Sequence, residues 1–137
     1  GLGDDFLRDK PVFADIAQAF VDFVRDDKLI IHNAAFDMKF LKLQEKRLNL
    51  KFDNPVLDTL LLSAYLYDYS DKHDLDTVAE RFDLKFESRH SALGDSLVTA
   101  GALLKMIDIL EGRGVLTLAD AIAALQKVLE KRAAPEF

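Results

Sequence analysis

The chain has 137 residues, which fits one domain, and its composition of 50% apolar and 31% charged residues argues against disorder. It has no cysteine, which excludes disulfides and thiolate metal sites. The net charge of −6 argues against a scaffold that binds duplex DNA by neutralising phosphates, but not against an enzyme with metal-binding carboxylates. Because no membrane span or signal peptide is visible, we predict a cytoplasmic protein without a membrane attachment.

The first third of the chain predicts a helix, a strand and a second helix. Pro11 marks the entry of a helix whose apolar residues recur at helical spacing from Phe13 to Val24. The short branched run at 29–31 is typical of a buried parallel strand. Asn33 then stands where an N-cap is expected, before a helix over 34–48.

The remainder predicts one further strand and four helices. Val56 and Leu57 form the second candidate strand, which ends at Asp58-Thr59. The helices are expected over 60–67, from Asp74 as a cap to Phe82, over 92–110 before a glycine-rich stop, and from Thr117 onward. In the helix over 92–110 we expect one apolar, core-facing side: Leu93, Leu97, Ala100, Leu104, Ile107 and Leu110.

Strands that alternate with helices predict an α/β domain with parallel strand pairing. Only two strands are credible, however, and a parallel sheet of two strands has two open edges. The fold is therefore either dominated by helices or joined by further strands before Gly1. The absence of an initiator methionine agrees with a trimmed start or a piece of something longer.

Two segments, over 32–37 and 90–95, place an acidic residue near the start of a helix. The acidic residues are Asp37 and Asp95, and His90 precedes the second of them by five positions. Hydrolysis of phosphodiesters with two metal ions needs carboxylates from separate elements, which hold the ions about 4 Å apart. A loop histidine beside them is a suitable general base. The segments therefore predict most of a two-metal site.

Each of these residues also has a structural explanation when it is taken alone. An aspartate near a helix start is usually a cap or a partner of the helix dipole. Loop histidines are usually at the surface or structural, which is the interpretation we prefer for His73. His32, at a strand end, is expected to be structural or to hold a metal ligand in position. Phe36 either stacks on a base or packs in the core. The basic residues of the same helix form either a solvated face or a track for a nucleic-acid backbone: Lys39, Lys42 and Lys46.

Together the segments resemble a known family. An apolar strand, His-Asn-Ala-x-Phe-Asp, a strand that ends in Asp-Thr, and His-x4-Asp at the start of a helix resemble the DnaQ-like 3′→5′ exonucleases. That family includes the epsilon subunit of bacterial DNA polymerase III, and the likeness is to its branch with a catalytic histidine. It runs from about Gly1 to about Leu110 and implies a ribonuclease H-like α/β fold with a mixed central sheet.

The resemblance also implies roles for single residues. Asp37 helps to hold one metal ion, Asp95 is a ligand of the other, and His90 is the general base; the ions are Mg2+ or Mn2+. Asn33 and Phe36 line the substrate groove. A sixth residue, Asp58, matches a frequent Asp-Thr pair and is expected to be structural.

One motif of the family is missing. Its first motif, Asp-x-Glu, supplies two of four metal carboxylates and is found nowhere in the 137 residues. We therefore expect an N-terminally truncated domain over 1–112 without three of five strands, loose metal binding and little turnover, and a C-terminal helical extension over 113–137. The exposed sheet edge would invite self-association or another chain, such as a polymerase subunit.

Three functional hypotheses follow. The first is a metal-dependent exonuclease domain, impaired in this chain, that removes 3′-terminal nucleotides from single-stranded DNA or RNA. The second is a non-catalytic binding or regulatory module on the same scaffold. The third is a helical bundle with chance motif matches. The choice between DNA and RNA depends on the groove around the sugar, which no residue of the sequence predicts.

Overall fold

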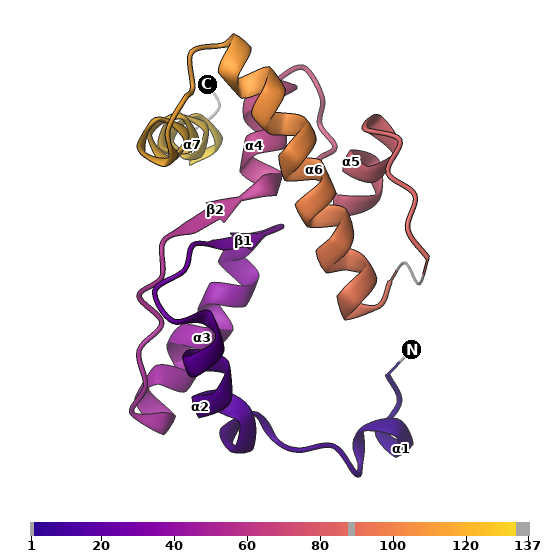
Figure 1. The fold of residues 1–137 in the computed structure, drawn as a ribbon, viewed down its shortest axis with the longest axis vertical. Coiled ribbons are helices and arrows are strands. Elements are labelled where there is room, and N and C mark those ends of the chain that lie inside the picture. Colours follow the sequence, from indigo (N-terminus) through magenta and orange to yellow (C-terminus); the bar gives the residue numbers. More distant parts are fainter. Residues whose placement is uncertain (1, 88–89, 134–137) are drawn as a thin grey trace. The chain divides into compact units, whose positions relative to one another are not determined.

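The computed structural model describes residues 2–87 and 90–133 of the chain (Figure 1). The helices and strands described there are α1 (Asp4–Leu7), α2 (Phe13–Val24), β1 (Leu29–Ile31), α3 (Ala34–Leu48), β2 (Val56–Asp58), α4 (Thr59–Leu66), α5 (Leu75–Arg81), α6 (Ala92–Gly112) and α7 (Leu118–Ala133). In this part of the chain β1 and β2 form a parallel sheet of two strands, as predicted. None of the described helices is long and apolar enough to cross a membrane.

Residue contacts divide the chain into two compact units. The first consists of Gly1–Leu29 and Phe36–Pro55, and the second of Ile30–Ala35 and Val56–Phe137. The chain passes from one to the other within β1, within the first turn of α3 and again before β2, so α3 begins in the second unit and continues in the first.

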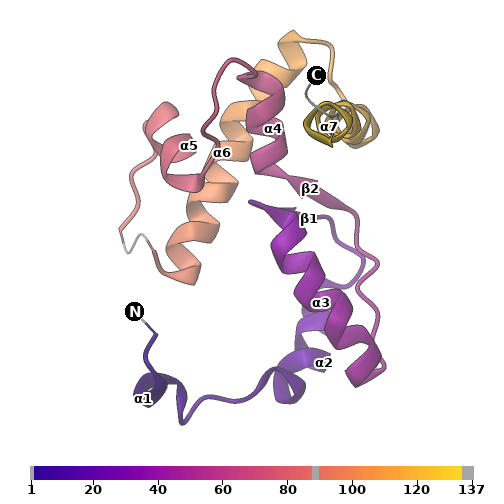
Figure 2. The ribbon, with the colours of Figure 1, turned by 180° about the vertical axis from the view of Figure 1, so that it is seen from behind.

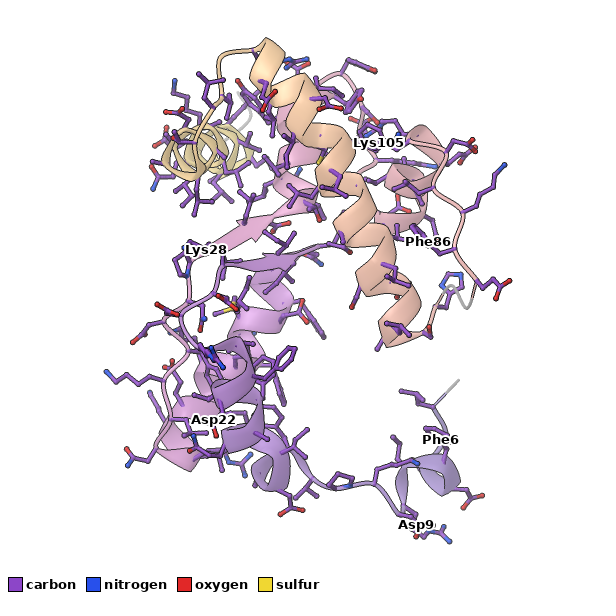
Figure 3. All side chains as sticks on the ribbon, in the orientation of Figure 1. Phe6, Asp9, Asp22, Lys28, Phe86 and Lys105 are labelled. Carbon is purple, nitrogen blue, oxygen red and sulfur yellow. The ribbon has the colours of Figure 1, made fainter. Side chains whose placement is uncertain are left out.

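The first unit is held by aromatic contacts between helices and the loop that follows α3. The rings of Phe13 and Phe40 meet edge to face with centroids 5.3 Å apart. The buried Phe52 lies against Phe20, with centroids 5.9 Å apart. The short helix α1 has no buried residue, and its Phe6 is 57% exposed (Figure 3).

Polar contacts fix the loop that leads from α3 to β2. The carboxylate of Glu45 accepts from the backbone N–H of Phe52 at 2.7 Å and from Nζ of Lys42 at 2.9 Å. Nearer to β2, the amide of Asn54 donates to the backbone oxygens of Arg25 and Asp27. These bonds attach the loop to α3 and to the segment that follows α2, and the charged groups that take part in them are not deeply buried.

The second unit contains the main hydrophobic core. Helix α4 contacts both α6 and α7, and α5 contacts α6 (Figure 2). The buried residues of this core come from β2 and these four helices: Leu57, Leu62, Leu66, Val78, Ala102, Met106, Leu110, Ala121 and Leu125. Helix α7 thus contributes to the packing of the second unit, and its assignment to a separate extension over 113–137 stays a prediction.

The predicted buried side of α6 is wrong except at Leu110. Five residues of that side are exposed: Ala100, and by 71%, 43%, 68% and 38% respectively Leu93, Leu97, Leu104 and Ile107. The helix instead buries Val98, Ala102, Met106 and Leu110. Because α6 carries apolar residues on more than one side, its spacing predicts a helix but does not select the side that faces the core.

Close packing also depends on Gly101 in the middle of α6. A Cβ atom at this position would lie 3.3 Å from Cδ2 of Leu84 and 3.5 Å from Cε2 of Phe86, which is labelled in Figure 3. The missing side chain therefore lets the segment that follows α5 pack closely against α6.

Three of the predicted helix ends are confirmed. The side chain of Asp74 caps α5 by accepting from the N–H of Thr77, and Oγ1 of Thr117 accepts from the N–H of Asp120 at the start of α7. Helix α6 ends at Gly112, and Gly114 follows with a φ of 79° that favours glycine.

Candidate functional site

Asp58, rather than Asn33, caps helix α3. Its two carboxylate oxygens accept from the backbone N–H groups of Asn33 at 3.1 Å and Ala34 at 2.9 Å. Asn33 itself has a φ of 64°, outside the extended conformation of an ordinary N-cap. The sequence prediction failed here because the capping group comes from 25 positions away.

The same carboxylate also caps α4. Oδ1 of Asp58 accepts from the N–H of Leu60 at 2.8 Å and, at 3.5 Å, from that of Leu61. Asp58 is only 8% exposed, so these backbone groups have little access to water in its place. One carboxylate therefore fixes the starts of both α3 and α4, which agrees with the structural role expected for Asp58.

His32, the residue directly after β1, has a hydrogen-bond partner on each ring nitrogen. Its Nδ1 lies 2.9 Å from Oγ1 of Thr59, and its Nε2 lies 2.8 Å from the backbone oxygen of His73. Burial lowers the pKa of His32 below its usual 6.5, against the opposing effects of the His73 backbone oxygen and of Asp58. His32 is thus a neutral residue that links β1 to the loop before α5.

His73 continues this network. Its Nδ1 lies 2.7 Å from Oγ of Ser63, and its Nε2 lies 2.8 Å from the backbone oxygen of Ser70. Arg81 donates to the same Ser63 hydroxyl at 2.8 Å, and its guanidinium lies 4.2 Å from the centroid of the Tyr67 ring. Burial, aided by the charge of Arg81, lowers the pKa of His73. His73 is buried at 7% exposure, which supports its predicted structural role.

His90 and Asp95 lie together at the start of α6. The backbone N–H of His90 donates to Oδ1 of Asp95 at 3.2 Å. Ser91 provides the N-cap, since its hydroxyl accepts from the N–H of Gly94 at 3.0 Å. The side chain of His90 is exposed and that of Asp95 is half-buried. His90 therefore has an accessible imidazole, and its backbone N–H holds the carboxylate of Asp95.

Asp37 and Phe36 stand in the part of α3 that belongs to the first unit. Asp37 is exposed in the first turn of the helix, and Phe36 is 76% exposed. The alternative that Phe36 packs in a core is therefore wrong for the described part of the chain. Asn33 is also exposed and precedes the helix in the second unit.

The structure thus joins two of the three predicted catalytic residues, His90 and Asp95, and leaves the meeting of Asp37 with them a prediction. Within residues 2–87 and 90–133, no three histidine or acidic side chains are grouped so that they could hold a metal ion. Carboxylates are suitable ligands for Mg2+, but the described residues alone do not fit a complete metal centre.

Comparison with known proteins agrees with the motifs. The model of an exonuclease family, RNase_T, matches residues 1–103. The chain therefore belongs to this exonuclease family, as one of the DnaQ-like enzymes whose fold is ribonuclease H-like. Members of the family generally depend on divalent metal ions.

Several relatives of the chain are named after DNA polymerase III. An epsilon-like protein of DNA polymerase III from Rhodobacter capsulatus is 36% identical over 93% of this chain and 18% of its own length. A PolC-type DNA polymerase III from Bacillus subtilis is 39% identical over 84% of the chain and 8% of its own length. The epsilon subunit from Rickettsia felis is 36% identical over 77% of the chain and 49% of its own length. The chain thus spans less than half the length of each of these relatives.

Sequence reasoning missed the polar network of the second unit. Its members come from four parts of the chain, and only the two in α4 share a helical spacing: His32, Thr59, Ser63, His73 and Arg81. The only local signal was the polar residue at the end of each strand, His32 after β1 and Asp58-Thr59 at β2. Such ends lie side by side in a parallel sheet, which predicts proximity but not partners.

Proposed function

We propose that this chain is a metal-dependent 3′→5′ exonuclease domain that removes terminal nucleotides from single-stranded nucleic acid. The observation that carries the proposal is the pairing of His90 with Asp95 at the start of α6, in a chain of the exonuclease family. Membership of the family does not by itself give this chain the activity of its much longer relatives, so that activity is part of the proposal.

The proposed chemistry assigns one task to each residue. A water molecule that attacks a phosphodiester must lose a proton, and the exposed imidazole of His90 is the proposed acceptor. Asp37 and Asp95 supply carboxylate oxygens of the kind that Mg2+ or Mn2+ binds. Because the sequence contains no Asp-x-Glu, we propose that the metal is held loosely and that turnover by this chain is weak.

The proposed substrate surface lies around the start of α3. The exposed ring of Phe36 is suited to stacking on a base, which contributes about 1–3 kcal/mol per base in single-stranded complexes. Asn33, three residues earlier in the chain, offers an exposed polar side chain. Lys39 and Lys46 are exposed on the same helix, whereas Lys42 is engaged by Glu45 and Asp53. Bases and phosphates are common to DNA and RNA, so these contacts are equally suited to single strands of either.

The names of the relatives support two further parts of the proposal. Because they are subunits or PolC-type forms of DNA polymerase III, we propose that the chain works in the cytoplasm with a polymerase subunit. Self-association through the open edge of the two-stranded sheet is the alternative interaction. Size-exclusion chromatography with light scattering at several concentrations tests the alternative, because self-association raises the measured mass with concentration.

The main test is Mn2+-dependent degradation of a 5′-labelled single-stranded oligonucleotide. We expect slow stepwise shortening from the 3′ end, lost in Asp95→Asn and His90→Gln. Asp95→Asn is informative because its amide oxygen still accepts from the N–H of His90, so loss of activity does not require loss of the local fold. Asp108→Asn, an exposed aspartate on the same helix, is the matched control and should keep the activity.

Two outcomes would contradict the proposal. Shortening that Asp95→Asn leaves unchanged would contradict the catalytic part assigned to Asp95. Absence of shortening would favour the non-catalytic binding module. Fluorescence anisotropy with the same oligonucleotide would then measure binding without cleavage. Tight, saturable Mn2+ binding in isothermal titration would contradict only the part that concerns loose metal binding, since it would require carboxylates beyond Asp37 and Asp95.

A further inference from the structure

The hydrogen bonds of His32 and His73 (the histidine pair) have a fixed direction. A backbone carbonyl can only accept, so Nε2 of each ring carries the proton: that of His32 faces the oxygen of His73, and that of His73 faces the oxygen of Ser70. Each Nδ1 must then accept from a hydroxyl, from Thr59 for His32 and from Ser63 for His73. Both rings are therefore held as the neutral Nε2–H tautomer.

A second proton would break this arrangement at both rings. Protonation of Nδ1 places a donor opposite a hydroxyl that is itself donating. The hydroxyl of Ser63 already accepts from Arg81, and both Ser63 and Thr59 are 0% exposed, so neither hydroxyl can exchange its lost acceptor for water. The O–H group of Ser63 or Thr59 would then be a buried donor without an acceptor, which is costly. This cost falls on the protonated form of the histidine alone.

The charges around the two rings differ. His73 faces the guanidinium of Arg81 on α5 and that of Arg132 on α7, both of which oppose a positive imidazole, while Asp71 in its own loop favours one. His32 faces Asp58 at the end of β2 and Asp74 at the start of α5, which favour its charged form and only partly offset burial. Because Nε2 of His32 bonds to the backbone of His73, release of one ring removes a partner of the other.

We propose that the histidine pair is a pH-sensitive switch: in the neutral form it holds the loop of residues 67–74 to α4 and to the end of β1, and on protonation it releases this loop. The hydrogen bonds that join the loop to Ser63 and to the residue after β1 run through the two rings, from Ser70 and His73. Arg81 adds two longer bonds, both 3.4 Å, to Oγ of Ser70 and to the backbone oxygen of Lys72. The switch does not depend on the proposed nuclease activity, since none of its members is assigned a part in that chemistry.

The direction of the pH effect follows from the burial of both rings. Their pKa values are lowered in the folded chain relative to the usual 6.5, so the released state binds more protons than the closed state. The hold on the loop is complete above about pH 6.5 and is lost as the pH falls from there toward the lower folded pKa values. For each ring that takes up a proton only on release, the opening constant rises by up to about tenfold per pH unit.

The first test is a histidine-detected NMR titration of the chain from about pH 8 to about pH 5. We expect two of the three histidines to show the Nε2–H tautomer at neutral pH and to take up a proton below 6.5. As they do so, the backbone amides of Ser70 and Lys72 should gain fast motion, while that of Met106 in the core stays rigid. Protonation without any change in these loop amides would overturn the proposal, and so would an Nδ1–H tautomer in either ring.

The second test compares urea unfolding midpoints at about pH 7.5 and about pH 5.5. The wild-type midpoint should fall at the lower pH, and His90→Gln, which removes the third and exposed histidine, should keep this fall. The double variant His32→Gln/His73→Gln should lose it. A fall that vanishes in His90→Gln, or persists in the double variant, contradicts the switch. If the double variant does not fold, the titration of the wild-type chain still decides the question.

Discussion

Each unit of the chain contains a carboxylate that accepts from backbone N–H groups, Asp58 in the second and Glu45 in the first, and these two carboxylates differ in burial. In the second unit Asp58 is 8% exposed and accepts from the N–H groups of Asn33, Ala34 and Leu60. In the first, the side chain of Glu45 is 22% exposed and accepts one backbone N–H together with the ammonium of Lys42. Asp58 is thus buried together with its backbone partners, whereas Glu45 stays nearer to water.

The apolar residues follow the same division. The second unit has a continuous core in which Leu62, Val78 and Met106 are 0% exposed. The first buries only a few described residues, namely Ala17, Val24, Leu41 and Phe52, while Phe23 and Leu43 are 83% and 58% exposed. Because stability is distributed unevenly wherever burial is uneven, we infer that the second unit carries most of the free energy of folding. Three substitutions test this inference.

The largest effect is expected from Leu62→Ala in the core of the second unit. Leu62 is 0% exposed, so its truncation should lower the free energy of unfolding by about 2–5 kcal/mol, measured by urea denaturation. The matched variant Leu43→Ala, at a position 58% exposed in the first unit, should change it by less than about 0.5 kcal/mol. Equal losses in the two variants would remove the distinction between the units.

Asp58→Ala should come second, with a loss of about 3 kcal/mol, because two helix caps are removed by one change. The N–H groups of Asn33, Ala34 and Leu60 would all lose their acceptor in a site that is only 8% exposed. Asp58→Asn keeps one acceptor oxygen and should lose less. Circular dichroism and urea unfolding measure both variants. A loss in Asp58→Ala no larger than that of a single surface cap would show that water replaces the carboxylate.

The smallest effect is expected from Glu45→Gln, and it should depend on pH. The N–H of Phe52 and then Lys42 lower the pKa of Glu45 below its usual 4.5. The ionised form therefore stabilises the first unit above about pH 4.5, and this contribution is lost as the pH falls through the lower folded pKa. Urea midpoints measured from about pH 5 to about pH 3 should fall less in Glu45→Gln than in the wild type. Glu130→Gln, on an exposed position of α7, should fall like the wild type.

Local signals in the sequence predicted the elements well. The strand at 29–31 and the helix from Phe13 to Val24 have the predicted bounds, because a branched apolar run and a helical stripe are properties of neighbouring residues. The family was also predicted from local motifs, and its match over residues 1–103 confirms it.

Properties that depend on distant partners were predicted less well. The apolar pattern of α6 could not show that Leu104 is exposed and Met106 buried, since that depends on where α4 and α5 pack. The sequence around Asn33 likewise could not show that Asp58, 25 positions later, caps α3 in its place. Of the candidate site, the closeness of His90 and Asp95 followed from their separation of five residues, whereas the role of Asp37 stays a prediction.

The backbone of His90 has a consequence for protein engineering. Its φ of 67° lies in the left-handed region, which costs a residue with a side chain about 1 kcal/mol relative to glycine. His90→Gly would relieve this strain at the same time as it removes the imidazole. It should therefore give a reference protein that resists heat better than the wild type while lacking the proposed proton acceptor. Histidine at this position would then be a case in which thermal robustness is given up for chemistry.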